Sequence, residues 1–224
     1  PLDIDYDRYV TIKNNLRKNN YNPKKIYKSS LFNVVDVGFN SIFLKANKDL
    51  VSILKNFNLD SFDISKYIKI TEKNILKLFD KRKGTFFSLD IKNKKKIEIP
   101  SITNYFILFA DLNNEKINNK LIKNLKKHNQ KEKYFFSSIK PNHKSFEEKR
   151  YWRGPVWINC NWILYKGLKN KDHLFSKKIK NLTIKLIEKK GIYEYYSCKN
   201  GKPMGASNFS WSAALYLDLI LSKN

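Results

Sequence analysis

The sequence predicts an all-α domain, a helical toroid or bundle that carries a small β-hairpin insertion. About seven stretches of the 224 residues have helical apolar spacing, whereas residues 84–99 alternate and turn as paired strands do. Hydrophobic residues make up 42 % of the chain, and glycine and proline number only 7 and 6. These values exclude disordered, collagen-like and low-complexity classes, and a chain of this length can bury a core of its own.

The first half of the chain predicts three helices, near residues 3–19, 35–57 and 64–80. Asp3 or Asp5 can cap the first helix, and Asn22-Pro23 breaks the chain after it. Asp36 suits the cap of the second helix better than the role of an acid. That helix carries a broad apolar stripe on one face: Phe39, Ile42, Phe43, Ala46, Leu50, Ile53 and Leu54.

The hairpin follows at residues 84–99, where a lysine-rich turn separates two apolar arms and Pro100 ends the second. Helices are predicted near 103–111 and 114–127, and residues 128–150 form a long loop. Two further helices are predicted near 155–168 and 173–189, with Gly191 as the C-cap of the latter. An aromatic loop, residues 192–209, leads into a last helix at 211–222.

The formal net charge is +25, which is common in nucleic-acid-binding proteins. Only 5 of the 45 basic residues are arginine, however, whereas nucleic-acid surfaces favour arginine for bidentate contacts. Abundant lysine together with asparagine and isoleucine resembles the drift of an AT-rich genome. We therefore expect no nucleic-acid partner, and a polyanion-binding helical protein is the alternative from a different class.

The sequence also argues against a membrane protein, a disulfide-rich protein and a metal-binding protein. No apolar run approaches the roughly 20 residues that span a bilayer, and the start of the chain shows no signal-peptide pattern. Cys160 and Cys198 are too few for a disulfide scaffold, so a cytoplasmic location is expected. His128, His143 and His173 have no partner at ligand spacing, so neither a metal nor a cofactor is expected, and His128 is expected to be solvated.

Two loops carry residues suited to chemistry. The first holds Tyr151, Trp152 and Trp157 beside arginines; aromatic faces next to hydrogen-bond donors suit sugar binding, although such a Trp can also be a core anchor. The second places Glu194 among Tyr193, Tyr195 and Tyr196. A carboxyl group among aromatic side chains suits general acid–base work, and the alternative is a surface glutamate in a tyrosine-rich turn.

These loops also carry a family resemblance. The segments YWRGPVWINCNWILYKGL (151–168) and GIYEYYSCKNGKPMGASNFSWSAALYLDLI (191–220) resemble the C-terminal part of (α/α)6-barrel glycoside hydrolases. That group contains the mannosylglycerate and glucosylglycerate hydrolases and the processing α-glucosidase (glycoside hydrolase family 63), and is more distantly similar to trehalases and glucoamylases. The earlier helices also look like the group's, so the resemblance covers nearly the whole chain and is weakest between about residues 61 and 140.

The resemblance implies a partial (α/α)6 toroid, formed as a single domain over residues 1–224. Glu194 matches the group's catalytic base. The remaining matched positions are expected to contact the sugar: Tyr6, Tyr151, Trp152, Trp157 and Asn208.

One departure bears on the mechanism. The group's general acid is an aspartate in a Gly-x-Asp-Asn-Ser-Pro-like segment that precedes the stretch matching Tyr6, and this sequence has no such segment. We therefore expect the C-terminal part of a longer enzyme, inactive alone. The expected reaction is inverting hydrolysis of a small α-glucoside or α-mannoside such as glucosylglycerate or mannosylglycerate. A trehalase-like or oligosaccharide α-glucosidase and a non-catalytic sugar-binding remnant are the alternatives, and the oligomeric state is open.

Overall fold

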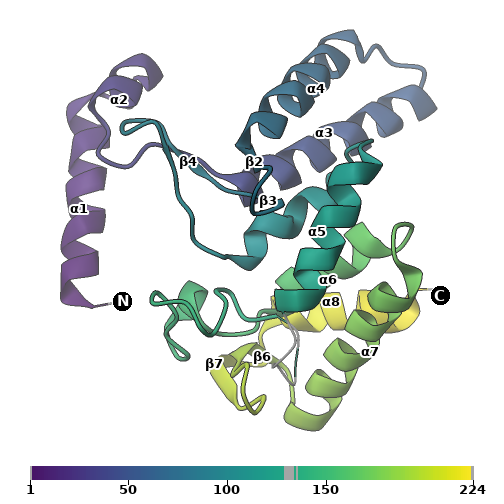
Figure 1. The fold of residues 1–224 in the computed structure, drawn as a ribbon. Helices are drawn as coiled ribbons and strands as arrows, with labels where there is room; N and C mark the ends of the chain where they lie inside the picture. Colours follow the sequence, from purple (N-terminus) through teal and green to yellow (C-terminus); the bar gives the residue numbers. More distant parts are fainter. Residues whose placement is uncertain (1, 129–133, 135, 223–224) are drawn as a thin grey trace.

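The computed structural model describes residues 2–128, 134 and 136–222, and it is mostly helical (Figure 1). The α-helices are α1 (Asp3–Lys18), α2 (Pro23–Ser29), α3 (Val37–Asn56), α4 (Phe62–Ile75), α5 (Glu115–His128), α6 (Ile158–Leu168), α7 (His173–Lys190) and α8 (Ser210–Leu221). Three 3-10 helices are η1 (Leu76–Leu78), η2 (Ile102–Leu108) and η3 (Tyr151–Arg153). The predicted helical class is confirmed, and η2 replaces the α-helix expected near 103–111.

The strands are short and all pairings between them are antiparallel. They are β1 (Val34–Val35), β2 (Phe79–Asp80), β3 (Thr85–Phe86), β4 (Leu89–Asp90), β5 (Lys95–Lys96), β6 (Tyr193–Tyr196) and β7 (Pro203–Ser207). The hairpin expected at residues 84–99 is present as β4–β5, with Leu89 opposite Lys96, and β1 adds to its other edge. The helix expected to reach residue 80 instead ends at Ile75, because η1 and β2 follow.

The predicted caps Asp36 and Gly191 are confirmed, and the predicted cap of α1 is wrong. Asn22 accepts a hydrogen bond from the Lys25 amide at the start of α2, and Asp172 accepts one from the Phe175 amide at the start of α7. The N-cap of α1 is Leu2 and not Asp3 or Asp5. Asp5 instead reaches back from the first turn and accepts the Leu2 amide at 3.0 Å.

Helix α3 turns its small residues inward. Asp36 caps it as predicted and accepts the Phe39 amide at 2.7 Å. The buried positions are Val37, Gly38, Ser41 and Leu44; a Cβ on Gly38 would lie only 2.9 Å from the Thr103 Cβ.

The predicted apolar stripe of α3 therefore faces outward instead of packing on this core. We call six of its members the α3 outer face: Phe39, Ile42, Phe43, Ala46, Leu50 and Ile53. The five large side chains among them are 40–70 % exposed, and only Leu54 of the stripe is half-buried. The 3-10 helix η2 packs on the opposite side of α3. Within the described part of the chain, no element buries the α3 outer face.

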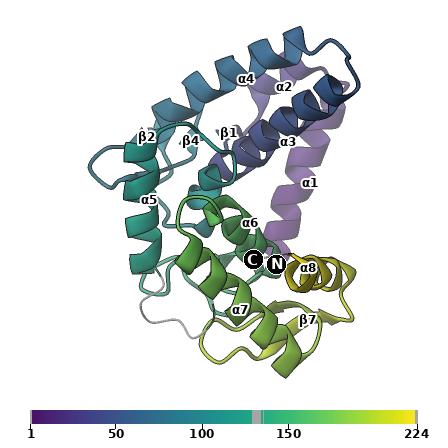
Figure 2. The same ribbon diagram turned by 90° about the vertical axis from the view of Figure 1, so that its right-hand side faces the viewer.

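The core lies where η2, α5, α6 and α7 meet. Its fully buried members include Ile107, Leu125, Phe136 and Leu164. Gly167 of α6 permits a close crossing, since a Cβ there would lie 2.7 Å from the Phe109 amide nitrogen. Figure 2 shows α6 beside α7, with the β6–β7 hairpin at one end of the group.

His128 contradicts the expectation that it is solvated. It closes α5 and is buried, with ring contacts to Tyr105 at 6.0 Å and Phe136 at 6.3 Å. Burial, assisted by the positive charge of Lys140, lowers the pKa of His128 to about 4. The loop predicted at 128–150 is confirmed where it is described, and its residues 129–133 and 135 lie outside the described residues.

None of the helices described in the structure combines the length and apolar character needed to cross a bilayer.

Candidate active site

Glu194 lies on the short β6–β7 hairpin, at an irregularity in its register. Tyr193 pairs with Ser207, but Tyr195 pairs with Met204, so β7 bulges by one residue opposite the glutamate, at Gly205 and Ala206. Bulges of this kind re-aim side chains and are common beside active sites. The carboxylate is fixed at both oxygens: the Tyr151 hydroxyl donates to Oε1 at 2.8 Å, and the Ala206 amide donates to Oε2 at 3.2 Å.

Gly205 leaves room for the carboxylate of Glu194 because it has no side chain. Its φ is +74°, and a Cβ built there would lie 2.5 Å from Glu194 Oε2 and 2.7 Å from Tyr195 Cε1. Only a residue without a side chain lets β7 pass this close to the glutamate.

An aromatic cluster forms one wall beside Glu194. The rings of Trp152 and Trp157 stack at 4.0 Å, nearly parallel at 8°, and Tyr195 continues the layer 4.9 Å from Trp157. Tyr151 stands edge-on to all three rings. Trp157 is buried and its Nε1 donates to the Tyr151 carbonyl at 3.2 Å, whereas Tyr151 and Trp152 are each 43 % exposed.

The negative charge of Glu194 contributes to a raised pKa in two neighbouring tyrosines. The pKa of Tyr151 is raised, chiefly by its hydrogen bond to Glu194 and further by burial. The pKa of Tyr195 is also raised, first by burial and then by the same carboxylate. Both phenols therefore stay protonated beside the carboxylate, and Tyr151 remains a hydrogen-bond donor.

Ion pairs shape the loop that carries Tyr151. Glu147 binds Arg150 at 3.1 Å and Arg153 at 2.9 Å, and Arg150 also binds Asp5 of α1 at 2.7 Å. Glu148 ties the same loop to the end of β6. It accepts the Ser197 hydroxyl at 2.6 Å and pairs with Lys199 at 2.8 Å.

A cleft of about 310 Å³ opens where these elements meet. It is lined by Leu2, Glu147, Lys149, Arg150, Tyr151 and Tyr195. Tyr151 and Tyr195 join this cleft to the aromatic wall, whereas Glu194 and the two indoles are not among its lining residues. An aromatic wall beside a concave space with polar groups is suited to binding a sugar.

The structure brings together four of the six predicted site residues: Tyr151, Trp152, Trp157 and Glu194. Tyr6 lies exposed on α1, where its ring packs edge-on against Tyr9, although Asp5 next to it is joined to the site through Arg150. Asn208 follows β7 with a φ of +52°, and its amide donates to the Ile192 carbonyl. Among the described contacts neither Tyr6 nor Asn208 touches Glu194, so their roles stay predictions.

Sequence reasoning missed the backbone part of the site. Neither Gly205 nor the Ala206 amide was a candidate, although a glycine between predicted strand residues is a known sign of a bulge or a close approach. Nothing in the sequence indicated the contacts of Glu148 and Arg150, because their partners Ser197 and Asp5 lie 49 and 145 residues away. In the described part of the chain, no three His, Cys, Asp or Glu side chains gather as a metal site would require.

Comparisons with known proteins identify the family of this chain. Residues 1–212 match the family model described as a mannosylglycerate hydrolase MGH1-like glycoside hydrolase domain. The mannosylglycerate hydrolase of Thermus thermophilus is 36 % identical over 220 residues, which are 97 % of this chain and 52 % of that protein. The glucosylglycerate hydrolase of Mycolicibacterium hassiacum is 24 % identical over 97 % of this chain and 51 % of its own length.

The fold agrees as well. The crystal structure of GH63 mannosylglycerate hydrolase from Thermus thermophilus in complex with Tris is 35 % identical and superposes with a TM-score of 0.93. The match covers 97 % of this chain and 53 % of that one. The chain thus spans about half the length of the curated relatives that it matches. It belongs to the mannosylglycerate hydrolase MGH1-like glycoside hydrolase family.

Proposed function

We propose that this chain forms the part of a glycoside hydrolase that carries the general base, Glu194. The substrate is a small α-mannoside or α-glucoside such as mannosylglycerate or glucosylglycerate, the compounds for which its relatives are named. One observation carries the proposal: a half-buried carboxylate, held at both oxygens by Tyr151 and the Ala206 amide, at the edge of a stacked aromatic wall.

The proposed reaction is hydrolysis with inversion. One carboxylate takes a proton from water, which attacks the anomeric carbon, while a carboxylic acid about 6.5–9.5 Å away protonates the leaving oxygen. Each oxygen of Glu194 accepts one hydrogen bond in the structure and keeps a lone pair for the water. Fixing the carboxylate before the water arrives lowers the cost of orienting the two reactants.

The general acid lies, in this proposal, outside the chain. The carboxylates near the site are unsuited to the role, because Asp5, Glu147 and Glu148 are each bound to arginine or lysine. The pKa of Asp5 is lowered, first by its hydrogen bond from the Leu2 amide, and that of Glu148 is lowered by Lys199 and Ser197. A proton donor needs a raised pKa instead.

The sugar is proposed to stack on the aromatic wall and to meet Tyr6 and Asn208 at its rim. The chain forms a single domain, part of an (α/α)6 toroid, and needs no cofactor. We place it in the cytoplasm; Cys160 and Cys198 are both buried, and the structure pairs neither of them in a disulfide.

The test uses a chimaera in which this chain replaces the matching segment of the Thermus thermophilus enzyme. We expect the chimaera to release mannose from mannosylglycerate, and the isolated chain to release none. Glu194→Gln should lower kcat by about 10²–10⁴-fold while substrate binding persists, since it removes proton transfer and keeps the shape. Near-normal kcat in Glu194→Gln contradicts the role of the base, and turnover by the isolated chain contradicts the external acid.

A matched control is Glu188→Gln. The side chain of this exposed glutamate of α7 accepts a hydrogen bond from the Tyr216 hydroxyl at 3.3 Å and lies outside the candidate site, so the substitution should leave kcat unchanged.

A further inference from the structure

Tyr151 and Glu194 lie on two separate segments that must be held at hydrogen-bonding distance. Tyr151 lies in the loop of residues 147–154, and Glu194 lies 43 positions later on β6. A hydrogen bond tolerates little change of distance, so a shift of about 1 Å between the two segments would break this one. The contacts that join the loop to β6 therefore decide whether the carboxylate is fixed.

The loop 147–154 is a compact unit. Its two ends bond to each other, since the Glu147 amide donates to the Arg153 carbonyl at 3.0 Å and the Arg153 amide donates to the Arg150 carbonyl at 2.7 Å. Gly154 closes the unit, because a Cβ at this position would overlap the Glu147 carbonyl oxygen. Tyr151 therefore moves with the whole unit, and its place relative to β6 depends on how the unit is anchored.

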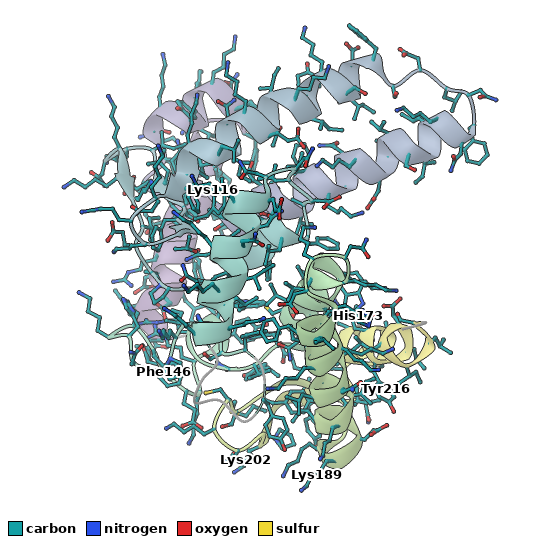
Figure 3. All side chains as sticks on the ribbon, turned by 45° about the vertical axis from the view of Figure 1, so that its right-hand side comes forward. Lys116, Phe146, His173, Lys189, Lys202 and Tyr216 are labelled. Carbon is teal, nitrogen blue, oxygen red and sulfur yellow. The ribbon has the colours of Figure 1, made fainter. Side chains whose placement is uncertain are left out.

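The unit is anchored to the end of β6 on both sides of its tyrosine. After the tyrosine, Val156 and Tyr196 exchange two backbone hydrogen bonds of 2.8 and 2.9 Å. Before it, Glu148 accepts the Ser197 hydroxyl at 2.6 Å and pairs with Lys199 at 2.8 Å. One anchor alone leaves the unit free to turn, whereas two anchors fix its orientation. In Figure 3, Phe146, which precedes the unit, and Lys202, in the turn after β6, lie at the same end of the molecule.

The bond between Glu148 and Ser197 is the stronger part of the second anchor. The Glu148 side chain is 27 % exposed and Ser197 is buried, so little water competes for their charge-assisted hydrogen bond. Ser197 is itself fixed, because its amide donates to the Lys202 carbonyl at 2.9 Å. Lys199 is 65 % exposed, and ion pairs to such a side chain contribute little.

We propose that Glu148 is a positioning residue, which holds the loop 147–154 where the Tyr151 hydroxyl reaches Glu194. No described contact joins Glu148 to Glu194 itself, so Glu148 acts through Tyr151. The inference rests on the proposed function, because the tyrosine that Glu148 positions holds the proposed general base.

The first test follows the Tyr151 hydroxyl in the isolated chain, by NMR of tyrosine labelled at the ζ carbon. The signal is assigned by its loss in Tyr151→Phe. The pKa of Tyr151 is raised chiefly by its hydrogen bond to Glu194, so this pKa reports the bond. Glu148→Ala should bring it toward that of an ordinary tyrosine. Glu148→Gln should leave it raised, since the amide oxygen still accepts the Ser197 hydroxyl. An unchanged Tyr151 pKa in Glu148→Ala overturns the proposal.

Glu72→Ala is the matched control. Glu72 is another partly buried glutamate, 32 % exposed and paired with Lys48 at 2.7 Å. It lies on α4, at the end of the molecule away from β6 (Figure 1). Glu72→Ala should leave the Tyr151 pKa unchanged. If Glu148 only stabilised the fold, Glu148→Ala would lower Tm and likewise leave the Tyr151 pKa unchanged.

The second test measures kinetics in the chimaera described above. Glu148→Ala should lower kcat by roughly 10–100-fold, because a misplacement of about 1 Å has a cost of this order, and should change KM by a smaller factor. Glu72→Ala should change neither. An unchanged kcat in Glu148→Ala, in a chimaera that Glu194→Gln inactivates, overturns this inference alone. Near-normal kcat in Glu194→Gln contradicts the role of the base instead, and the Tyr151 pKa then still tests Glu148.

Ser197→Ala covers a Glu148→Ala chain that does not fold. It removes one hydroxyl and leaves the ion pair between Glu148 and Lys199 in place. The Tyr151 pKa should fall in the same direction as in Glu148→Ala. An unchanged Tyr151 pKa in a folded Ser197→Ala chain overturns the proposal as well.

Discussion

Gly205→Ala tests whether the backbone of β7 fixes the carboxylate of Glu194. The added Cβ would lie 2.5 Å from Oε2, closer than nonbonded atoms approach, so the carboxylate must move. Gly191→Ala is the matched control. Gly191 also has a positive φ, +85°, but a Cβ there meets only the ring of Tyr193, at 3.3 and 3.7 Å.

The expected magnitudes follow from these distances. Holding alanine at a positive φ costs about 1–3 kcal/mol, and both variants carry a cost of this kind; Gly191, with a ψ of 176°, lies in a region that almost only glycine adopts. At Gly205 the displaced carboxylate also loses the hydrogen bonds from Tyr151 and Ala206, each about 1 kcal/mol in a partly exposed site. The free energy of unfolding should therefore fall by about 3–5 kcal/mol in Gly205→Ala and about 1–3 kcal/mol in Gly191→Ala, so the loss at Gly205 is greater by about 2 kcal/mol.

Thermal denaturation of the isolated chain measures the difference. For a chain of this length, 2 kcal/mol corresponds to roughly 4–8 °C in Tm. The ultraviolet titration of Tyr151, identified by its loss in Tyr151→Phe, should also move toward the ordinary tyrosine pKa in Gly205→Ala alone. Equal Tm losses in the two glycine variants, together with an unmoved Tyr151 titration, would refute the reasoning.

Three further outcomes are expected. Glu194→Gln should lower the raised pKa of Tyr151, since it removes the carboxylate that raises it, and the phenolate absorbance near high pH reports this. His128 has a folded pKa of about 4 against 6.5 ordinarily, so the stability it contributes is full above pH 6.5 and is lost as pH falls toward 4. Up to about 3 kcal/mol is involved, and urea midpoints should fall less steeply over that range in His128→Gln; parallel slopes would contradict the burial of His128. In the isolated chain, Leu44→Ala should lower the free energy of unfolding by about 2–5 kcal/mol, because Leu44 is buried. Phe43→Ala should lower it by less than about 1 kcal/mol, because Phe43 is exposed. The reverse order would contradict the assigned faces of α3.

The sequence predicted helices and local ends well, because caps and breaks act within a few residues. Asp36, Asn22 and Gly191 act where their chemistry predicts. Periodicity also located the stripe on α3 correctly. Periodicity alone could not show which face of α3 packs on the core. The helix packs through the small residues Gly38 and Ser41, which lie on the side opposite the stripe.

Burial and long-range contacts were harder to predict. His128 sits in a lysine-rich stretch, yet its surroundings are set by Tyr105 and Phe136. The grouping of Tyr151 with Glu194 came from family motifs, because no local rule joins residues 43 positions apart. The bulge at Glu194 depends on strand register, which a short tyrosine-rich strand leaves undetermined.

The stacked indoles have an optical consequence. Trp152 and Trp157 stack at 4.0 Å, so their excited states couple, and this should alter the circular dichroism of the intense far-ultraviolet band of indole relative to isolated tryptophans. Trp152 is half exposed while Trp157 is buried, so a sugar ring settling on the outer indole perturbs one member of the pair. The chain thereby carries its own spectroscopic probe, able to report ligand binding without any assay of turnover.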